Sequence, residues 1–239
     1  NLINTVRGFL AQVEGENNPY AQECKELAQL VAAPQLAWTP EENGKTKLSY
    51  ARTSKYDNLL RYEGYELILK ILRYLYQIDA YISIAEVARE RGFVFAEALP
   101  LGGNILEIEG MFHPLIENAI PNSIQADAEH NVVFLTGANM AGKSTFMKTF
   151  GIVVYLAHMG FPLPVKKMRF SVQNGMYTTI NLPDNMMLGY SHFYAEVQRL
   201  KKVAEQVGRI GNLVIVFDEL FRGTNVKDAH EATLAVMEA

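Results

Sequence analysis

Residues 137–144 read Gly137-Ala138-Asn139-Met140-Ala141-Gly142-Lys143-Ser144. They fit the pattern G-x-x-x-x-G-K-[ST], in which the glycines let the backbone turn tightly and approach an anion. The loop amides and the positive end of the following helix would bind phosphate oxygens, and Lys143 would reach the β- and γ-phosphates. The Ser144 hydroxyl can bind Mg²⁺. The alternative interpretation is a glycine turn before a helix whose lysine is merely solvated.

The segments around this loop have the hydrophobic patterns of alternating strands and helices. The run Val132-Val133-Phe134-Leu135 is typical of a strand buried on both faces, and helical residues follow from Lys143 to about Met159. We also expect strands at residues 105–108, 176–180 and 213–217, and helices at residues 193–207 and from 227 onward. This alternation predicts an α/β fold of the P-loop NTPase type, with a mainly parallel sheet, over residues 101–239.

Two adjacent carboxylates follow the second buried run, which ends at Phe217. Ligands of open α/β sheets bind at the carboxyl ends of the strands, so Asp218 and Glu219 should lie beside the phosphate loop. Asp218 would hold Mg²⁺ directly or through water, and Glu219 would act as general base toward the attacking water. The alternative is an acidic pair that only caps the next turn.

The first hundred residues show helical periodicity and form a separate all-helical region in this prediction. Apolar residues recur with helical spacing at residues 2–13, 24–31 and 56–91, and residues 38–48 are expected to be a loop. The third segment would be a helix about 50 Å long, with Gly64 as its weak point. We interpret its tyrosines as packing residues, because a base-stacking surface needs interleaved Lys and Arg.

The composition is that of a packed protein. The chain has 239 residues, 49% hydrophobic and 20% charged, with a net charge of −4, which excludes disorder and a uniformly basic nucleic-acid-binding protein. The single cysteine, Cys24, excludes an internal disulfide and a cysteine-based zinc site, and favours a cytoplasmic setting. No apolar run is long enough to span a bilayer. The chain begins with Asn1 rather than Met, as expected for a fragment.

Several motifs, in the same order and at similar spacings, resemble those of the MutS family of DNA mismatch-repair ATPases. Residues 136–145 are similar to the family's T-G-P-N-M-G-G-K-S-T, and residues 218–225 to its D-E-I-G-R-G-T-S. Between them, residues 191–196 resemble S-T-F-M-x-E. Upstream, His113-Pro114 matches the R-H-P element, and residues 160–164 resemble I-G-x-x-V-P. The resemblance extends from about residue 104 to the end of the chain.

The resemblance implies an ABC-type ATPase that forms a homodimer around ATP and Mg²⁺ and couples this to double-stranded DNA. Each nucleotide would lie between one subunit's phosphate loop and the other's signature segment, which Ser191 and Asn225 would represent here. The adenine would pack on Ile120, because residues 119–123 lack the aromatic ring that the family usually has there. The residues expected to bind ATP are Ile120, Gly137, Ala138, Asn139, Met140, Ala141, Gly142, Lys143, Ser144 and Thr145.

Other features depart from the family pattern and keep alternatives open. Ala138 and Ala141 replace the usual Pro and Gly of the loop, and no mismatch-reading domain is visible. His230 lies in the helix after the acidic loop, which is not where the family places its γ-phosphate histidine. The alternatives are an ABC- or SMC-type ATPase with another role, or a nucleotide-binding scaffold without catalysis. The basic clusters at residues 166–169 and 201–202 are more typical of solvated faces than of DNA contacts.

Overall fold

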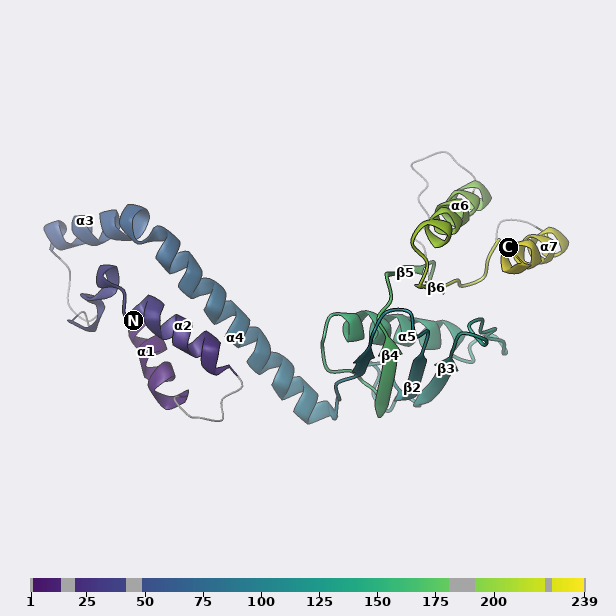
Figure 1. Cartoon of the computed structure of the whole chain (residues 1–239), viewed down its shortest axis with the longest axis horizontal. Coiled ribbons are helices and arrows are strands. Elements are labelled where there is room, and N and C mark those ends of the chain that lie inside the picture. Colours follow the sequence, from purple (N-terminus) through teal and green to yellow (C-terminus); the bar gives the residue numbers. More distant parts are fainter. Residues whose placement is uncertain (1, 14–19, 42–48, 181–191, 222–224, 239) are drawn as a thin grey trace. The chain divides into compact units, whose positions relative to one another are not determined.

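The computed structural model describes residues 2–13, 20–41, 49–180, 192–221 and 225–238 (Figure 1). The chain divides into two compact units, residues 1–85 and residues 86–239, and the boundary lies within a long helix. The sequence places the boundary between the helical region and the ATPase region after residue 100, and this assignment of roles stays a prediction. Of the helices described, none is both long enough and apolar enough to cross a membrane.

The first unit is built from helices packed around one apolar cluster. Helices α1 (Leu2–Val13) and α2 (Ala21–Val31) are followed by the short 3₁₀ turns η1 (Pro34–Leu36) and η2 (Thr39–Glu41). Apolar side chains at helical spacing face one another between these elements and the next long helix. The buried members of the cluster are Ile3, Val6, Leu10, Leu27, Val31, Leu36 and Ile71.

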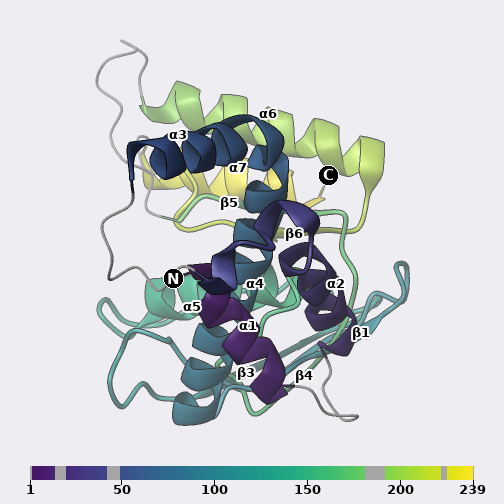
Figure 2. The same cartoon turned by 90° about the vertical axis from the view of Figure 1, so that its left-hand side faces the viewer.

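The long periodic segment forms two helices instead of the single one expected over residues 56–91. Helix α3 (Tyr50–Asn58) leads into a π-helical turn, η3 (Leu59–Glu63), and helix α4 (Tyr65–Arg91) begins after Gly64. The Gly64 amide donates to the Leu59 carbonyl at 2.6 Å, which is the i→i+5 bond of a π-turn. The helix direction changes at this point (Figure 1 and Figure 2). The single-helix prediction was therefore wrong, and the break falls at the residue identified as the weak point.

Polar contacts fasten the helices of the first unit at two places. The Arg7 guanidinium donates to the carbonyls of Val31 at 2.6 Å and Leu36 at 3.2 Å, and to the Thr39 hydroxyl at 2.7 Å. It therefore binds the carbonyl end of α2 and both 3₁₀ turns from α1. On the other side, the Tyr74 hydroxyl on α4 donates to Glu26 on α2. This hydrogen bond lowers the pKa of Glu26 and raises that of Tyr74.

The second unit contains a mixed four-stranded sheet in the order β1-β4-β2-β3. Its strands are β1 (Glu97–Leu99), β2 (Leu106–Met111), β3 (Asn122–Ala126) and β4 (Lys167–Ser171). Only the β1–β4 pair is parallel, while β4–β2 and β2–β3 are antiparallel. The prediction of a mainly parallel sheet is therefore wrong for this sheet, because β2, which was expected, pairs antiparallel with β3 and β4, for which no strand was expected.

A separate pair of parallel strands and three helices complete the second unit. Strands β5 (Gly175–Thr178) and β6 (Leu213–Val216) pair in parallel, within two residues of the strands expected there. Helices α5 (Lys143–His158), α6 (His192–Ile210) and α7 (Val226–Glu238) also match the expected positions. The α/β class predicted from the alternation is confirmed.

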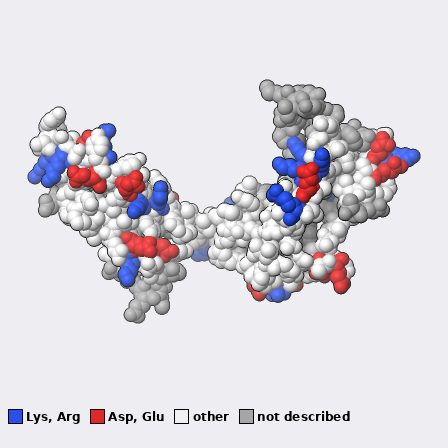
Figure 3. All heavy atoms as spheres, turned by 45° about the horizontal axis from the view of Figure 1, so that its top comes forward, with Lys and Arg blue, Asp and Glu red and all other residues white. Residues whose placement is uncertain are grey.

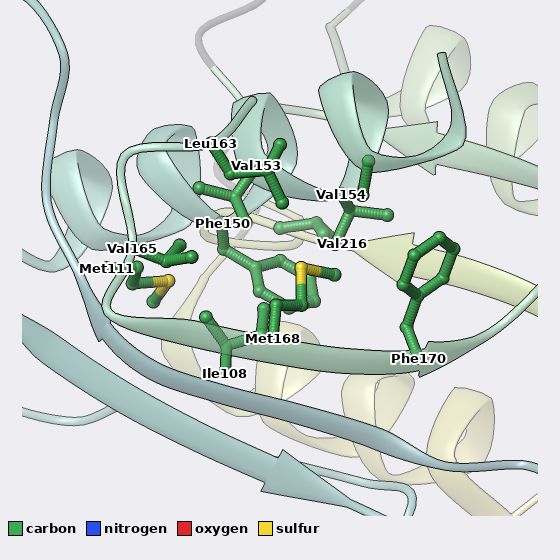
Figure 4. Close-up of a cluster of buried hydrophobic side chains, with 11 residues drawn as sticks. Ile108, Met111, Phe150, Val153, Val154, Leu163, Val165, Met168, Phe170 and Val216 are labelled. Carbon is green, nitrogen blue, oxygen red and sulfur yellow. The ribbon is translucent and has the colours of Figure 1, made fainter. Parts of the chain in front are cut away.

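Helix α5 packs on one face of the four-stranded sheet and forms the main core (Figure 1 and Figure 4). Phe150, Val153 and Val154 on α5 lie over Ile108 on β2 and Met168 on β4, which are partners in the strand register. Val216 of β6 belongs to the same cluster. One core therefore fixes both the helix that follows the glycine-rich loop and the strand that precedes the acidic pair.

The predicted buried strand at residues 132–135 is wrong. These residues are in no strand, and their exposed fractions are 58%, 54%, 69% and 38%. Apolar residues form a buried strand only where neighbouring strands and helices cover them. Within the described part of the chain, the strands pair with one another and none pairs with this run. The loop it precedes is held through α5 instead.

Charges on the four-stranded sheet pair across the strands. Arg169 on β4 binds Glu97 on β1 and Glu107 on β2, each at 3.1 Å, and Lys166 lies 3.4 Å from Glu109. The hydrogen bond that Arg169 donates to Glu107 and the charges of both glutamates raise the pKa of Arg169. Basic and acidic atoms also lie next to one another on the face that Figure 3 shows. This pairing favours the solvated-face interpretation of the 166–169 cluster.

We predict that Arg7→Ala lowers the free energy of unfolding of the first unit by about 1–3 kcal/mol, because it leaves partly buried carbonyls without a donor. Trp38 is the single tryptophan, and its ring stacks on that of Tyr56 in the same unit, with 3.9 Å between the ring centroids. Its fluorescence therefore reports the unfolding of this unit. Urea unfolding should therefore shift to lower concentration in the variant. Lys25→Ala, on an exposed face of α2, is the control. Equal midpoints for the two variants would contradict the fastening role of Arg7.

Candidate functional site

The glycine-rich loop is a tight turn that ends at the first residue of α5. The Ala141 amide donates to the Ala138 carbonyl at 3.2 Å, and Met140 and Gly142 have positive φ angles of 66° and 94°. Gly142 is the N-cap of α5 and supplies no side chain to bond the first amides of the helix. These amides therefore remain oriented toward the loop, with the positive end of the helix dipole behind them.

Lys143 folds over the loop. Its ammonium group donates to the carbonyls of Gly137 at 2.8 Å and Ala138 at 3.0 Å. The charge thus lies on the carbonyls of the first two residues of the loop. Phosphate oxygens are stronger partners for an ammonium than neutral carbonyls. If an anion bound in the loop, the Lys143 ammonium could exchange its hydrogen bonds with the two carbonyls for hydrogen bonds with the anion.

The acidic pair meets the loop. The Ser144 hydroxyl on the first turn of α5 donates to Oδ2 of Asp218 at 3.2 Å, although 74 residues separate them in the chain. Both side chains are half-buried. A hydroxyl and a carboxylate are hard oxygen donors, and Mg²⁺ is usually bound by one or two such groups together with substrate phosphates and water. The pair therefore fits Mg²⁺, and its assignment as a metal site stays a prediction.

The turn after Asp218 has an unusual backbone. Glu219 and Phe221 both have positive φ angles, 47° and 62°, which cost energy for residues with a side chain. Phe221 is only 4% exposed and so anchors the turn, while Glu219 is exposed. Such strain persists only where the surroundings enforce it. The turn presents Glu219 next to Asp218, and the catalytic role of Glu219 stays a prediction.

Of the two residues predicted to face a partner subunit, only Asn225 lies within the described residues, and Ser191 lies outside them. Asn225 caps α7, since its Oδ1 accepts from the Asp228 amide at 2.9 Å and its Nδ2 donates to the Asp228 carboxylate at 2.6 Å. Within one chain, the Asn225 side chain therefore serves as the N-cap of α7. Its contact with a second subunit stays a prediction.

The sequence did not reveal two cavities near these residues. The larger, about 390 Å³, lies beside the loop and is bounded by the segment between β2 and β3; Ile120 lines it. The smaller is lined by residues from the end of β5, from α6 and from the acidic turn, among them Thr179, Glu196 and Leu220. Thr179 Oγ1 and Glu196 Oε2 are buried there without a partner among the described atoms.

These features define an α/β protein with a glycine-rich loop at the start of a helix and a serine–aspartate pair beside it. Residues 133–239 match the sequence family described as MutS domain V. The chain is 32% identical over 177 residues to DNA mismatch repair protein MutS of Thermus aquaticus, covering 73% of this chain and 21% of that protein. It is 30% identical over 168 residues to the MutS of Lactococcus lactis subsp. cremoris, covering 68% of this chain and 20% of the relative.

DNA mismatch repair protein MutS 1 of Halobacterium salinarum is 31% identical over 169 residues, with 70% of this chain and 19% of the relative covered. The chain thus belongs to the MutS family. It spans about a fifth of the length of these relatives. The matched family region includes the glycine-rich loop and the acidic pair.

We predict that Gly142→Ala destabilises the chain by about 1–2 kcal/mol, because a Cβ is disfavoured at a φ of 94°. The apparent melting temperature by circular dichroism should fall by about 2–8 °C. Gly151→Ala is the matched control, since Gly151 lies within α5 and an added Cβ meets nothing within 4 Å. It should be neutral or stabilising. A Gly142→Ala variant as stable as the Gly151→Ala variant would contradict the loop conformation.

Proposed function

We propose that this chain is the ATP-binding and ATP-hydrolysing module, with a P-loop NTPase fold, of a MutS-like DNA mismatch-repair protein. The observation that carries the proposal is the 3.2 Å contact between Ser144 and Asp218 next to the glycine-rich loop. Membership of the MutS family supports it, since the relatives are named DNA mismatch repair proteins.

In this proposal the phosphates of ATP lie in the loop formed by residues 137–145. The first amides of α5 donate to the phosphate oxygens, and the helix dipole adds to this attraction. Lys143 exchanges the carbonyls of Gly137 and Ala138 for the β- and γ-phosphates. This exchange needs only a rotation of the lysine side chain, because the ammonium already lies at the loop.

Ser144 and Asp218, whose side chains are joined by a hydrogen bond in the structure, would hold Mg²⁺. The chemistry that Mg²⁺ supplies when bound is neutralisation of the charge on the β- and γ-phosphates. Glu219 would accept a proton from a water molecule whose oxygen attacks the γ-phosphorus. The bond to the bridging oxygen of ADP breaks, and inorganic phosphate and ADP are released. Glu219 is suited to this because the strained turn presents it beside Asp218.

We further propose that two copies pair through their ATPase regions, with Ser191 and Asn225 of one copy facing the nucleotide of the other. ATP-dependent pairing would then be coupled to double-stranded DNA in the cytoplasm. The pairing of Lys166 and Arg169 with glutamates argues against this cluster as the DNA contact. A DNA contact elsewhere in the assembly would show a steep dependence of affinity on salt.

We predict that Lys143→Ala weakens ATP binding at least about 10-fold, because each hydrogen bond to a charged group contributes about 1.5–3 kcal/mol. The affinity is measured by calorimetric titration of the full chain in the presence of Mg²⁺. Lys148→Ala is the control, since Lys148 is an exposed lysine of the same helix. Unchanged affinity in the Lys143→Ala variant would refute the phosphate-loop assignment.

We predict that Glu219→Gln slows ATP hydrolysis by about 10²–10⁴-fold while ATP affinity stays nearly the same, because only proton transfer is lost. Phosphate release is followed with time, with Mg²⁺ and with EDTA. Glu205→Gln, at an exposed position of α6, should hydrolyse ATP at the unmodified rate. Hydrolysis that persists in Glu219→Gln would assign the general base to another residue. No Mg²⁺-dependent phosphate release from the unmodified chain would contradict the hydrolytic part of the proposal.

A further inference from the structure

We propose that the 390 Å³ cavity beside the loop takes the base of the bound nucleotide and accepts guanine as well as adenine. This inference rests on the proposed function, because phosphates held in the loop determine where the rest of the nucleotide lies. Its new content is the substrate class: purine nucleotides in general, rather than adenine nucleotides alone.

The position of the cavity suits a base. It shares Ala141, Gly142, Lys143 and Thr145 with the loop, so phosphates bound there leave the nucleoside at its mouth. Its opposite wall is the segment between β2 and β3, which the Arg91 guanidinium anchors by donating to the Pro114 carbonyl. The volume is within the range of about 300–1,000 Å³ that is typical of small-molecule pockets.

The cavity wall is largely apolar, with the rings of Phe112 and Phe146 beside aliphatic side chains. Ile120 is 81% exposed, Ile116 47% and Leu135 38%, and all three line the cavity. A planar ring lying against Ile120 would remove this apolar surface from water, which favours binding. Contact of this kind depends on the area of the ring and not on its exocyclic groups. It therefore favours purines over the smaller pyrimidines without distinguishing adenine from guanine.

Discrimination between the two purines would need a polar group fixed as a donor or as an acceptor at position 6. Adenine carries an amino group there, which donates, and guanine a carbonyl oxygen, which accepts. The side-chain amides that line the cavity belong to Asn118 and Asn122, and each offers both an N–H donor and an oxygen acceptor. They can therefore satisfy either purine.

The hydrogen bonds already made in this wall leave that choice open. Asn122 uses one N–H to donate to the Ile120 carbonyl at 2.9 Å and keeps its oxygen and its second N–H. His113 accepts the Leu115 amide on Nδ1 at 3.3 Å, so Nε2 remains for the ligand. None of the described residues that line the cavity is an aspartate or glutamate, the acceptor that would select the N1–H and amino group of guanine. Sites that do select use such committed polar groups and reach about 10⁴–10⁵-fold.

The experiment is calorimetric titration of the full chain with ADP, GDP and CDP in the presence of Mg²⁺. We expect the dissociation constants of ADP and GDP to agree within about fivefold, and CDP to bind more than about fivefold more weakly. A larger difference between ADP and GDP would overturn the inference. CDP binding within fivefold of ADP would also overturn it, because the base would then not occupy the cavity.

A pair of variants locates the base. Ile120→Ala should raise the dissociation constants of ADP and GDP by the same factor, about 3–10-fold, because both purines lose the same aliphatic contact. Leu115→Ala is the control, since Leu115 is 84% exposed on the same segment and does not line the cavity. Unequal losses for ADP and GDP, or no loss for either, would overturn the inference. Both side chains are exposed, so neither change should disturb folding, which circular dichroism checks.

Failure of the proposed function gives a different result. If no nucleotide binds, or if Lys143→Ala leaves the affinity of every nucleotide unchanged, the phosphate-loop assignment itself fails. If Lys143→Ala weakens ADP binding but ADP is strongly preferred to GDP, the loop assignment stands and the purine inference alone is refuted.

Discussion

The contact between the Ser144 hydroxyl and the Asp218 carboxylate is the constraint on which the candidate site depends. Two segments far apart in the chain can meet at 3.2 Å only if the helix and the strand that carry them share one rigid support. That support is the core in Figure 4, where Phe150 and Val154 of α5 and Val216 of β6 belong to the same buried cluster. Close packing of this kind transmits small displacements, so changes in this core should alter the site as well as stability.

Backbone strain is concentrated on both sides of the same contact. Met140 and Gly142 precede Ser144, and Glu219 and Phe221 follow Asp218, all with positive φ angles. Three of these four residues carry side chains, so the conformation is costly and must be enforced by its surroundings. The buried Phe221 ring and the packed helix α5 provide that enforcement. The site therefore resembles others in which strain is maintained where geometry is needed for function.

The elements that depend on consecutive residues were predicted from the sequence. The glycine-rich loop, α5 and β6 follow from the G-x-x-x-x-G-K-S spacing and from uninterrupted apolar runs, and the weak point at Gly64 became the break between α3 and α4. Strand β4 was not predicted, although Lys167 to Ser171 alternate polar and apolar residues, because the run is short and its basic residues were interpreted as a charged cluster. The glutamates on neighbouring strands that pair with Arg169 come together with it only after folding. Residues 132–135 were predicted as a buried strand and are exposed outside any strand. Their apolar composition favours burial, but burial also needs distant segments to cover them, and a local pattern does not specify those segments.

The two halves of the proposed nucleotide site differ in the same way. The proposed phosphate-binding half is formed by the consecutive residues 137–144, so a short sequence motif is enough to predict it. The proposed base-binding half includes Ile120 and Asn122, which lie just before β3 and at its start, respectively. They are brought to the loop by the antiparallel pairing of β2 and β3 in the sheet that packs on α5. Phosphate binding can therefore stay constant while the base-binding wall changes by single substitutions. In the proposed site, selectivity for the base would therefore be set by the non-local half, which is lined by apolar side chains and by amides that can both donate and accept.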